Sequence, residues 1–260
     1  MAFAQTAARR PIEGAVATLG VSDRVAFLRK TYAHLGVALI AFAALSAGIM
    51  RFAPATSFRF SGWALSGRLN WLVVMGLFIL VGYIAEHLAR SNTSRGVQYL
   101  GLAIGVASWS LLLQPILWVL FLKFGNPEML RGDGGGGLMS GQAAAILMQA
   151  VVITLSIFIG LTATVFITKK DFSFMRGALA IGSFAALGVI IASMAFGFSL
   201  GAVFCGAMIL LMAGYILFQT SLVMSYFPPQ GYVAAALMLF STVAMLFWYV
   251  LQMLMSLNRR

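Results

Sequence analysis

Seven long runs of apolar residues follow one another along the chain, separated by short segments that carry glycine, proline and charged residues. The runs are continuous, without the alternation of apolar and polar positions that membrane strands show. Each approaches the roughly 20 residues that a helix needs to cross a hydrocarbon layer about 30 Å thick. The sequence therefore predicts an all-α membrane protein, a bundle of seven transmembrane helices. The expected spans are residues 33–50, 70–89, 97–122, 143–167, 176–196, 199–222 and 231–256.

The boundary between the fifth and sixth spans has the weakest signal, because only a short stretch with Gly197, Ser199 and Gly201 interrupts the apolar sequence there. A single helix over residues 176–222 would be about twice as long as one bilayer crossing requires. Two helices are therefore expected at this place.

Residues 1–30 are a polar, basic head, and residues 31–260 are the predicted transmembrane domain. The Arg9-Arg10 pair is not followed closely by an apolar stretch, so the head fits neither an ordinary nor a twin-arginine signal peptide. Its first ten residues contain arginine and no acid, which leaves a mitochondrial transit peptide as an alternative.

The composition agrees with a lipid environment. Of the 260 residues 62% are hydrophobic and 9% are charged, whereas soluble domains carry about 25% charged residues. The net charge of +11 raises the question of nucleic-acid binding, but the 17 basic residues flank the apolar runs and form no basic face. We therefore expect the lipid bilayer as the surroundings and no nucleic-acid partner.

The distribution of lysine and arginine predicts how the protein is oriented. With the N-terminus inside, the inner segments hold 10 of the 17 basic residues and the outer segments hold 7. Since cytoplasmic loops carry an excess of basic residues, we expect a cytoplasmic N-terminus and a C-terminus on the opposite side. The compact chain without a long tail favours a bacterial cytoplasmic membrane, with an organellar membrane as the alternative.

Few residues in or near the spans are able to carry chemistry. Glu86 is the one acid close to a span, and its spacing to Arg90 predicts an ion pair at a helix end. The last span contains no lysine, which excludes a retinal protein of the seven-helix type. His34 and His87 form no zinc-binding motif, and Ser140 has no obvious base. We therefore expect no enzyme, no catalytic residue, no cofactor and no bound metal.

Glycine occurs in two kinds of pattern. The tract at residues 132–137 lacks the Lys-Ser/Thr of a phosphate-binding loop and is expected to be a flexible connection. Gly101 with Gly105, and Gly188 with Ala192, are small residues one helical turn apart, which allow helices to approach closely in lipid. We expect both pairs to pack inside the bundle, with dimerisation as the alternative.

Three stretches in a fixed order carry a family resemblance. Residues 27–32 read Phe-Leu-Arg-Lys-Thr-Tyr at the entry to the first span, and residues 168–174 read Thr-Lys-Lys-Asp-Phe-Ser-Phe after the fourth. Residues 214–220 read Gly-Tyr-Ile-Leu-Phe-Gln-Thr, and Tyr-Val-Ala-Ala-Ala-Leu follows from residue 232. From about residue 24 to 256 the chain resembles the Bax inhibitor family, also called the transmembrane Bax inhibitor motif (TMBIM) family.

This resemblance implies a helical bundle whose last helix is central and is wrapped by the other six. It also implies a pH-sensitive calcium leak, because members of the family look like such leaks. Some bacterial members bind and modulate a membrane-anchored protease, and animal members are linked to suppression of cell death. Calcium ions and a membrane-anchored protease are therefore the partners that the resemblance brings into consideration.

The chain departs from the family pattern at the pH sensor. The resemblance implies a pair of aspartates in the last two helices, and these positions read Gln219 and Thr242 here. Both residues lie 11 or 12 positions from the turn between the two helices, hence about 17 Å from it at 1.5 Å per residue. We expect the two side chains to face each other near the midplane and to form a hydrogen bond.

Neither side chain titrates in the physiological range, and neither offers the carboxylate that calcium sites favour. The sequence therefore favours a calcium-leak-like membrane protein without the aspartate pH gate, with Gln219 and Thr242 at the sensor positions. The alternative is a non-conducting protein that regulates a membrane protease or other membrane proteins. A transporter for a neutral solute is a third interpretation, based only on polar residues such as Gln114, Gln149 and Gln252.

Overall fold

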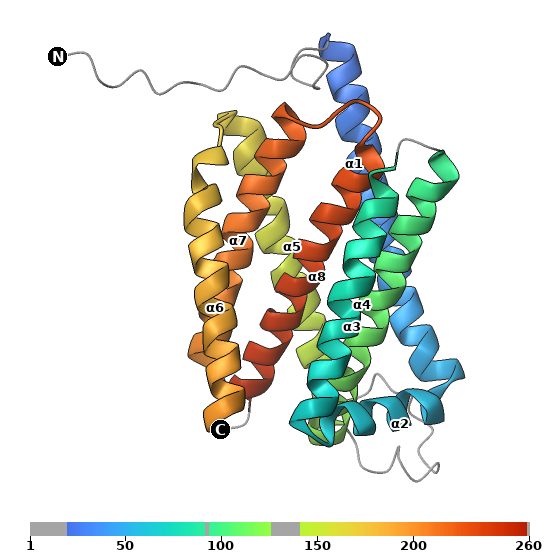
Figure 1. Ribbon diagram of the computed structural model, residues 1–260, viewed down its shortest axis with the longest axis vertical. Helices are drawn as coiled ribbons and strands as arrows, with labels where there is room; N and C mark the ends of the chain where they lie inside the picture. Colours follow the sequence, from blue (N-terminus) through green and yellow to red (C-terminus); the bar gives the residue numbers. More distant parts are fainter. Residues whose placement is uncertain (1–19, 92–93, 126–140, 259–260) are drawn as a thin grey trace, which may run out of the picture.

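The computed structural model describes residues 20–91, 94–125 and 141–258, and these residues form eight α-helices and one short 3-10 turn. In chain order the elements are α1 (Val21–Phe52), α2 (Pro54–Leu65), α3 (Arg68–Ala89), α4 (Arg95–Phe124), α5 (Gln142–Thr168), η3 (Ser173–Met175), α6 (Arg176–Phe196), α7 (Ala202–Ser225) and α8 (Tyr232–Leu257). The long helices run side by side as one bundle (Figure 1).

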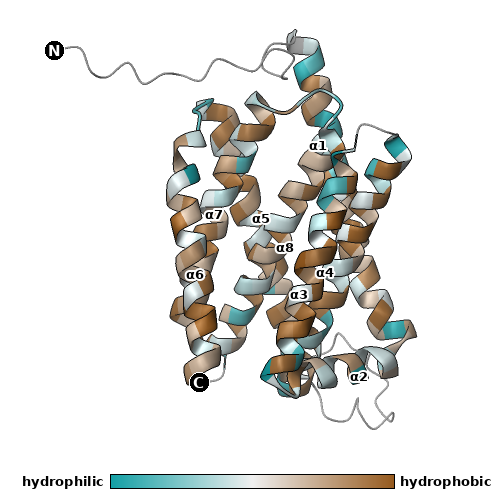
Figure 2. Ribbon diagram, viewed as in Figure 1, coloured by the Kyte–Doolittle hydropathy of each residue, from teal (hydrophilic) through white to brown (hydrophobic). Residues whose placement is uncertain are grey.

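All of these helices except α2 are long and apolar enough to cross a bilayer, which confirms the prediction of an all-α protein with seven candidate spans. Figure 2 shows hydrophobic residues along the length of the bundle and hydrophilic residues mainly near its two ends. The separation of the fifth and sixth spans has a local cause. Gly197 adopts the left-handed conformation, with φ of 79°, and ends α6 before α7 begins at Ala202.

Helix α8 forms the centre of the bundle. In its most apolar window 83% of the residues are buried, compared with 6% for the peripheral helix α6. It packs against α1, α3, α4, α5 and α7, and Figure 1 shows it between the other long helices. The central last helix that the resemblance implies is therefore present.

Helix α2 was not predicted from the sequence. Its 12 residues are too few to cross a bilayer, and Figure 1 shows it lying across the end of the bundle. Small residues on one face, Ser57, Ser61 and Ala64, are buried. Ser57 donates a hydrogen bond to Oε1 of Gln114 over 2.8 Å, which attaches α2 to α4.

Helix α1 begins well before the predicted first span of residues 33–50. It starts at Val21 and has 32 residues, or about 48 Å at 1.5 Å per residue, so it extends beyond the hydrocarbon layer. The helix runs without a break through the proposed boundary between head and domain at residue 30. That division remains a prediction, since residues 1–19 lie outside the described residues.

The two pairs of small residues have different surroundings. A Cβ atom on Gly101 would lie 2.5 Å from the carbonyl oxygen of Ala85 in α3, and one on Gly105 would lie 2.5 Å from a methyl group of Leu237 in α8. The first pair therefore packs inside the bundle, as predicted. The prediction was wrong for Gly188, which is exposed on α6 and would place a Cβ atom in open space.

The close approach of α4 to α3 gives a direct test of the packing. We expect Gly101→Ala to lower the free energy of unfolding by about 1–3 kcal/mol, because the added methyl group meets backbone atoms that cannot move independently. Denaturation in detergent micelles measures the change. Gly188→Ala is the matched control and should leave stability unchanged or slightly higher, since alanine favours the helix. Equal losses in both variants would contradict the packing described here.

Candidate functional site

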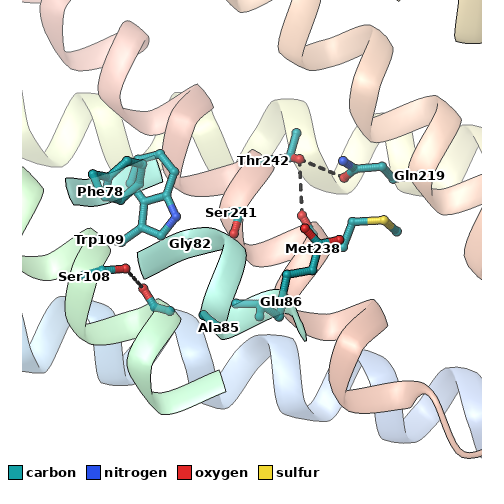
Figure 3. A pocket seen from close by; sticks show the side chains of 12 residues that line it. Phe78, Gly82, Ala85, Glu86, Ser108, Trp109, Gln219, Met238, Ser241 and Thr242 are labelled. Atoms are coloured by element: carbon teal, nitrogen blue, oxygen red, sulfur yellow. Dashed lines mark hydrogen bonds between the residues drawn. The ribbon is translucent and has the colours of Figure 1, made fainter. Parts of the chain in front are cut away.

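A cavity of about 320 Å³ lies between α3, α4, α7 and α8. Its wall combines apolar side chains with several polar ones, although it lies within an apolar bundle (Figure 3). The lining residues are Phe78, Gly82, Ala85 and Glu86 of α3, Gly105, Ser108 and Trp109 of α4, Gln219 of α7, and Leu237, Met238, Ser241 and Thr242 of α8. The cavity is therefore the first candidate for a site that holds or passes a polar species.

Gln219 and Thr242 form one side of this cavity and face each other, as expected from the sequence. The Thr242 hydroxyl donates a hydrogen bond to Oε1 of Gln219 over 2.8 Å, and it also lies 3.3 Å from the carbonyl oxygen of Met238 (Figure 3). Both side chains are buried. The contact joins α7 to α8 with two neutral groups, so it carries no charge that protons can change. Their role in an ion pathway remains a prediction.

The cavity also contains a carboxylate, which the sequence analysis did not place there. Glu86 lines the wall from α3 while its Oε1 accepts hydrogen bonds from Nη2 of Arg90 at 2.5 Å and from Nε at 3.2 Å. The predicted ion pair is therefore confirmed. Its carboxylate was missed as a cavity residue because sequence spacing identifies the partner along a helix but not the neighbouring helices.

The polar groups of the cavity mainly offer oxygen atoms that can act as ligands to a cation. They comprise the Glu86 carboxylate, the Gln219 amide and the hydroxyls of Ser241 and Thr242, with the Ser108 hydroxyl bound to the carbonyl oxygen of Gly105 over 2.9 Å. Oxygen ligands suit hard cations such as calcium. One carboxylate among neutral oxygens is a weak ligand set, which is compatible with passage of a cation and unfavourable for tight retention.

A second polar cluster explains the Asp-Phe-Ser part of the motif after α5. The Asp171 carboxylate accepts hydrogen bonds from the backbone N–H of Ser173 at 2.9 Å, its hydroxyl at 3.0 Å, the Ser221 hydroxyl at 2.9 Å and the Tyr226 hydroxyl at 3.4 Å. The Ser221 hydroxyl oxygen in turn accepts the N–H of Phe172 over 3.0 Å. The connection between α5 and α6 is thereby fastened to α7.

These contacts change the acidity of Asp171. Partial burial by itself raises the pKa of the carboxyl group, but the hydrogen bonds from Ser173, Ser221 and Tyr226 outweigh it, so the pKa lies below its ordinary value. The ionised form is therefore the one that holds the connection to α7. This group lies outside the spanning helices and does not line the cavity.

The other polar residues that the sequence analysis considered do not meet in the cavity. Gln114 is fully buried against α2, Gln149 is exposed, and Gln252 accepts a weak hydrogen bond from the thiol of Cys205 at 3.8 Å. Their separation gives no support to a common site for a neutral solute. Ser140 and the glycine tract at residues 132–137 lie outside the described residues.

The fold and the cavity define a multi-pass helical membrane protein with a polar site beside its central helix. A sequence model for the family described as "Inhibitor of apoptosis-promoting Bax1" matches residues 135–259. The chain is 30% identical to Bax inhibitor 1 of Schizosaccharomyces pombe over 244 residues, 92% of this chain and 79% of that protein. It is 25% identical to protein lifeguard 4 of Mus musculus over 246 residues, 94% of this chain and 91% of that protein.

A further relative is an uncharacterized protein of Pseudomonas aeruginosa, 32% identical over 117 residues, which are 45% of this chain and 51% of that protein. The similarity to the yeast protein extends over most of both chains. The chain therefore belongs to the Bax inhibitor-1 (TMBIM) family of integral membrane proteins.

The Asp171 cluster predicts a stability that depends on pH. We expect Asp171→Asn to lower the free energy of unfolding at pH 7 by about 1 kcal/mol or less, because the hydrogen bonds to a solvent-exposed carboxylate are weakened. Since the pKa is depressed in the folded state, the stabilisation is present above the ordinary aspartate pKa of about 4 and is lost as the pH falls through the folded value.

Denaturation curves in detergent at pH 7 and about pH 3 test this dependence. The difference in the free energy of unfolding between wild type and Asp171→Asn should be smaller at pH 3 than at pH 7. The control is the exposed Asp23, and Asp23→Asn should change the free energy of unfolding less than Asp171→Asn does at pH 7. If the difference between wild type and Asp171→Asn is instead larger at pH 3, the ionised carboxylate does not stabilise the fold.

Proposed function

We propose that this protein is a cation leak whose pathway runs through the cavity between α3, α4, α7 and α8, with calcium as the first candidate ion. The observation that carries the proposal is the Glu86 carboxylate in one cavity with the polar pair Gln219 and Thr242, inside a bundle that is otherwise apolar. Membership of the family supports calcium as the ion. The proposed activity is passage through the membrane and involves no bond chemistry.

The lining of the cavity supports this role on physical grounds. A cation that leaves water must replace its hydration shell with oxygen atoms, and hydroxyl, amide and carbonyl oxygens provide them. A negative charge in a low-dielectric cleft raises the local concentration of cations. Glu86 provides a carboxylate near one end of α3, half-exposed and paired with Arg90, while Gln219 and Thr242 provide neutral oxygens further along.

The proposed leak has no aspartate pH gate. In the arrangement that the resemblance implies, two carboxylates share a site and their protonation changes the contact between the last two helices. The contact between Gln219 and Thr242 is a neutral hydrogen bond of 2.8 Å, which persists across the physiological pH range. We therefore expect that pH changes in the physiological range do not open or close the proposed pathway at this contact.

We place the protein in a bacterial cytoplasmic membrane with a cytoplasmic N-terminus. The excess of basic residues on the side of the bundle where α1 begins supports this orientation. The relative in Pseudomonas aeruginosa supports a bacterial setting.

Restoring the two carboxylates tests the pathway. We expect Gln219→Asp combined with Thr242→Asp to make calcium flux into proteoliposomes depend on pH between 6 and 8, because two carboxylates in contact cannot both ionise freely. The wild type should show flux above protein-free liposomes with little change over this range. Ser183→Asp combined with Tyr215→Asp, at a hydrogen-bonded pair between α6 and α7 outside the cavity, is the matched control and should add no such dependence. Flux of the double variant that is constant from pH 6 to 8 would refute the pathway assignment.

The carboxylate of Glu86 gives an independent test. We expect Glu86→Gln to reduce calcium flux by about tenfold, because the cavity loses the charge that concentrates cations. Glu86→Gln combined with Arg90→Gln serves as a control for the unpaired arginine and should remain reduced. Full recovery in that double variant would assign the effect to the arginine and not to the cavity. Uptake of a fluorescent calcium indicator inside the liposomes is the measurement.

A non-conducting regulator of a membrane-anchored protease is the second candidate. The hydrogen bond between Gln219 and Thr242 favours it, since this bond holds α7 and α8 together beside the cavity without a charge that would release them. In this case the wild type and the Glu86→Gln variant would both leave flux at the level of protein-free liposomes. Co-purification of a protease in detergent, lost when residues 1–19 are deleted, would then support the second candidate.

A further inference from the structure

A group of basic and aromatic side chains lies where α1, α4 and α8 meet at the end of the bundle at which α8 begins. Its members are Lys30, His34, Arg95, Tyr99 and Tyr232, which we call the basic-aromatic cluster. Two cations from different helices face the same buried ring: Nζ of Lys30 and Cζ of Arg95 each lie 5.7 Å from the centroid of Tyr232. Nη1 of Arg95 also donates a hydrogen bond of 2.5 Å to the Tyr232 hydroxyl.

Histidine and tyrosine side chains hold this cluster in place. Nδ1 of His34 lies 2.7 Å from the carbonyl oxygen of Lys30, and it must donate because a carbonyl oxygen only accepts. Nε2 of the same ring lies 3.0 Å from the Tyr99 hydroxyl, and the two rings stack with centroids 5.5 Å apart. The ring of Tyr232 lies 5.0 Å from His34 on another side. The ring of His34 therefore contacts those of Tyr99 and Tyr232 beside the two cations.

The cluster has no acidic partner among residues 20–91, 94–125 and 141–258. Within these ranges the one ion pair joins Arg90 to Glu86, so neither Lys30 nor Arg95 has a carboxylate within 4.0 Å. Both of these side chains are exposed. Two cations beside one ring repel each other, and an anion bound near both would reduce this repulsion.

The position of the cluster indicates which anion it meets. Arg95 and Tyr232 are the first residues of α4 and α8, so the cluster lies where spanning helices leave the hydrocarbon. Tyr99 is 42% exposed and its neighbour Leu100 is 53% exposed on the outer surface, which places the cluster beside lipid. Tyrosine and basic residues at this depth are typical of contacts with lipid headgroups.

We propose that the basic-aromatic cluster binds the phosphate of an anionic phospholipid headgroup. Lys30 and Arg95 supply the charge and the N–H donors, Tyr232 holds Arg95 in position, and Tyr99 holds His34 by donating its hydroxyl proton to Nε2. The site joins three helices of the bundle, two of which, α4 and α8, also line the cavity. This inference does not depend on whether the cavity conducts ions.

Lipid binding to the purified full-length protein tests the proposal. Titration in detergent micelles with phosphatidylglycerol, followed by native mass spectrometry, should show tighter binding than titration with phosphatidylcholine, which carries no net charge. Each removed cation should weaken phosphatidylglycerol binding by about fivefold, which corresponds to about 1 kcal/mol per basic residue near a charged headgroup. We therefore expect about fivefold for Lys30→Gln and about 25-fold when Arg95→Gln is added.

The matched control removes the same charges from the opposite end of the bundle. Arg59 and Lys123 are exposed there, and the double variant Arg59→Gln, Lys123→Gln should bind phosphatidylglycerol as the wild type does. Equal loss in this control would overturn the proposal, as would unchanged binding in Lys30→Gln, whose exposed side chain carries little risk of misfolding. Displacement of the lipid by millimolar glycerol phosphate would overturn the assignment to a membrane lipid and leave a site for soluble phosphate. No displacement supports the lipid.

Discussion

The structure depends on one constraint, which is that an amide side chain inside the hydrocarbon has to find its hydrogen-bond partner within the protein. Lipid offers no hydrogen bonds, so an unpartnered amide there costs several kcal/mol. Two of the buried glutamines meet this constraint by joining helices: Gln114 binds Ser57 of α2, and Gln219 binds Thr242 of α8. These two hydrogen bonds therefore join α2 to α4 and α7 to α8, while apolar packing fills the space between the helices.

The central helix α8 takes part in both the cavity and the basic-aromatic cluster. Tyr232 begins this helix at the basic-aromatic cluster, and Thr242 lies ten residues further along, about 15 Å at 1.5 Å per residue. A shift of α8 at its first turn would therefore change the wall of the cavity. The Asp171 cluster joins the connection after α5 to α7 by hydrogen bonds. Helix α7 in turn packs along α8. Two of the four helices around the cavity, α7 and α8, therefore each carry one of these clusters at an end.

The seven spans were predictable from the sequence because hydropathy along the chain reports directly on the surrounding lipid. The sequence did not predict in the same way which residues of each helix face a neighbouring helix and which face lipid. Gly188 and Gly101 occur in equivalent patterns, yet only Gly101 meets a neighbouring backbone. Glu86 was assigned to Arg90 from spacing alone, and its place in the cavity depends on α7 and α8, more than 100 residues away in sequence. Helix α2 escaped prediction since its buried face consists of small residues that carry little apolar signal.

Under the proposed function, the neutral pair Gln219 and Thr242 gives the site different energetics, as well as a different response to pH, from the aspartate pair that the resemblance implies. Burying a carboxylate near the middle of a bilayer is costly, and a pair that shares a proton reduces this cost only while the proton stays. Gln219 and Thr242 avoid the cost with a neutral hydrogen bond, and the charge of the cavity instead lies with Glu86, whose side chain is 52% exposed and paired with Arg90. Under the proposed function, a cation would be attracted at the end of α3 and would meet no charged group between α7 and α8. Such a pathway binds its ion weakly at mid-depth, and its rate follows the cation concentration and not the proton concentration.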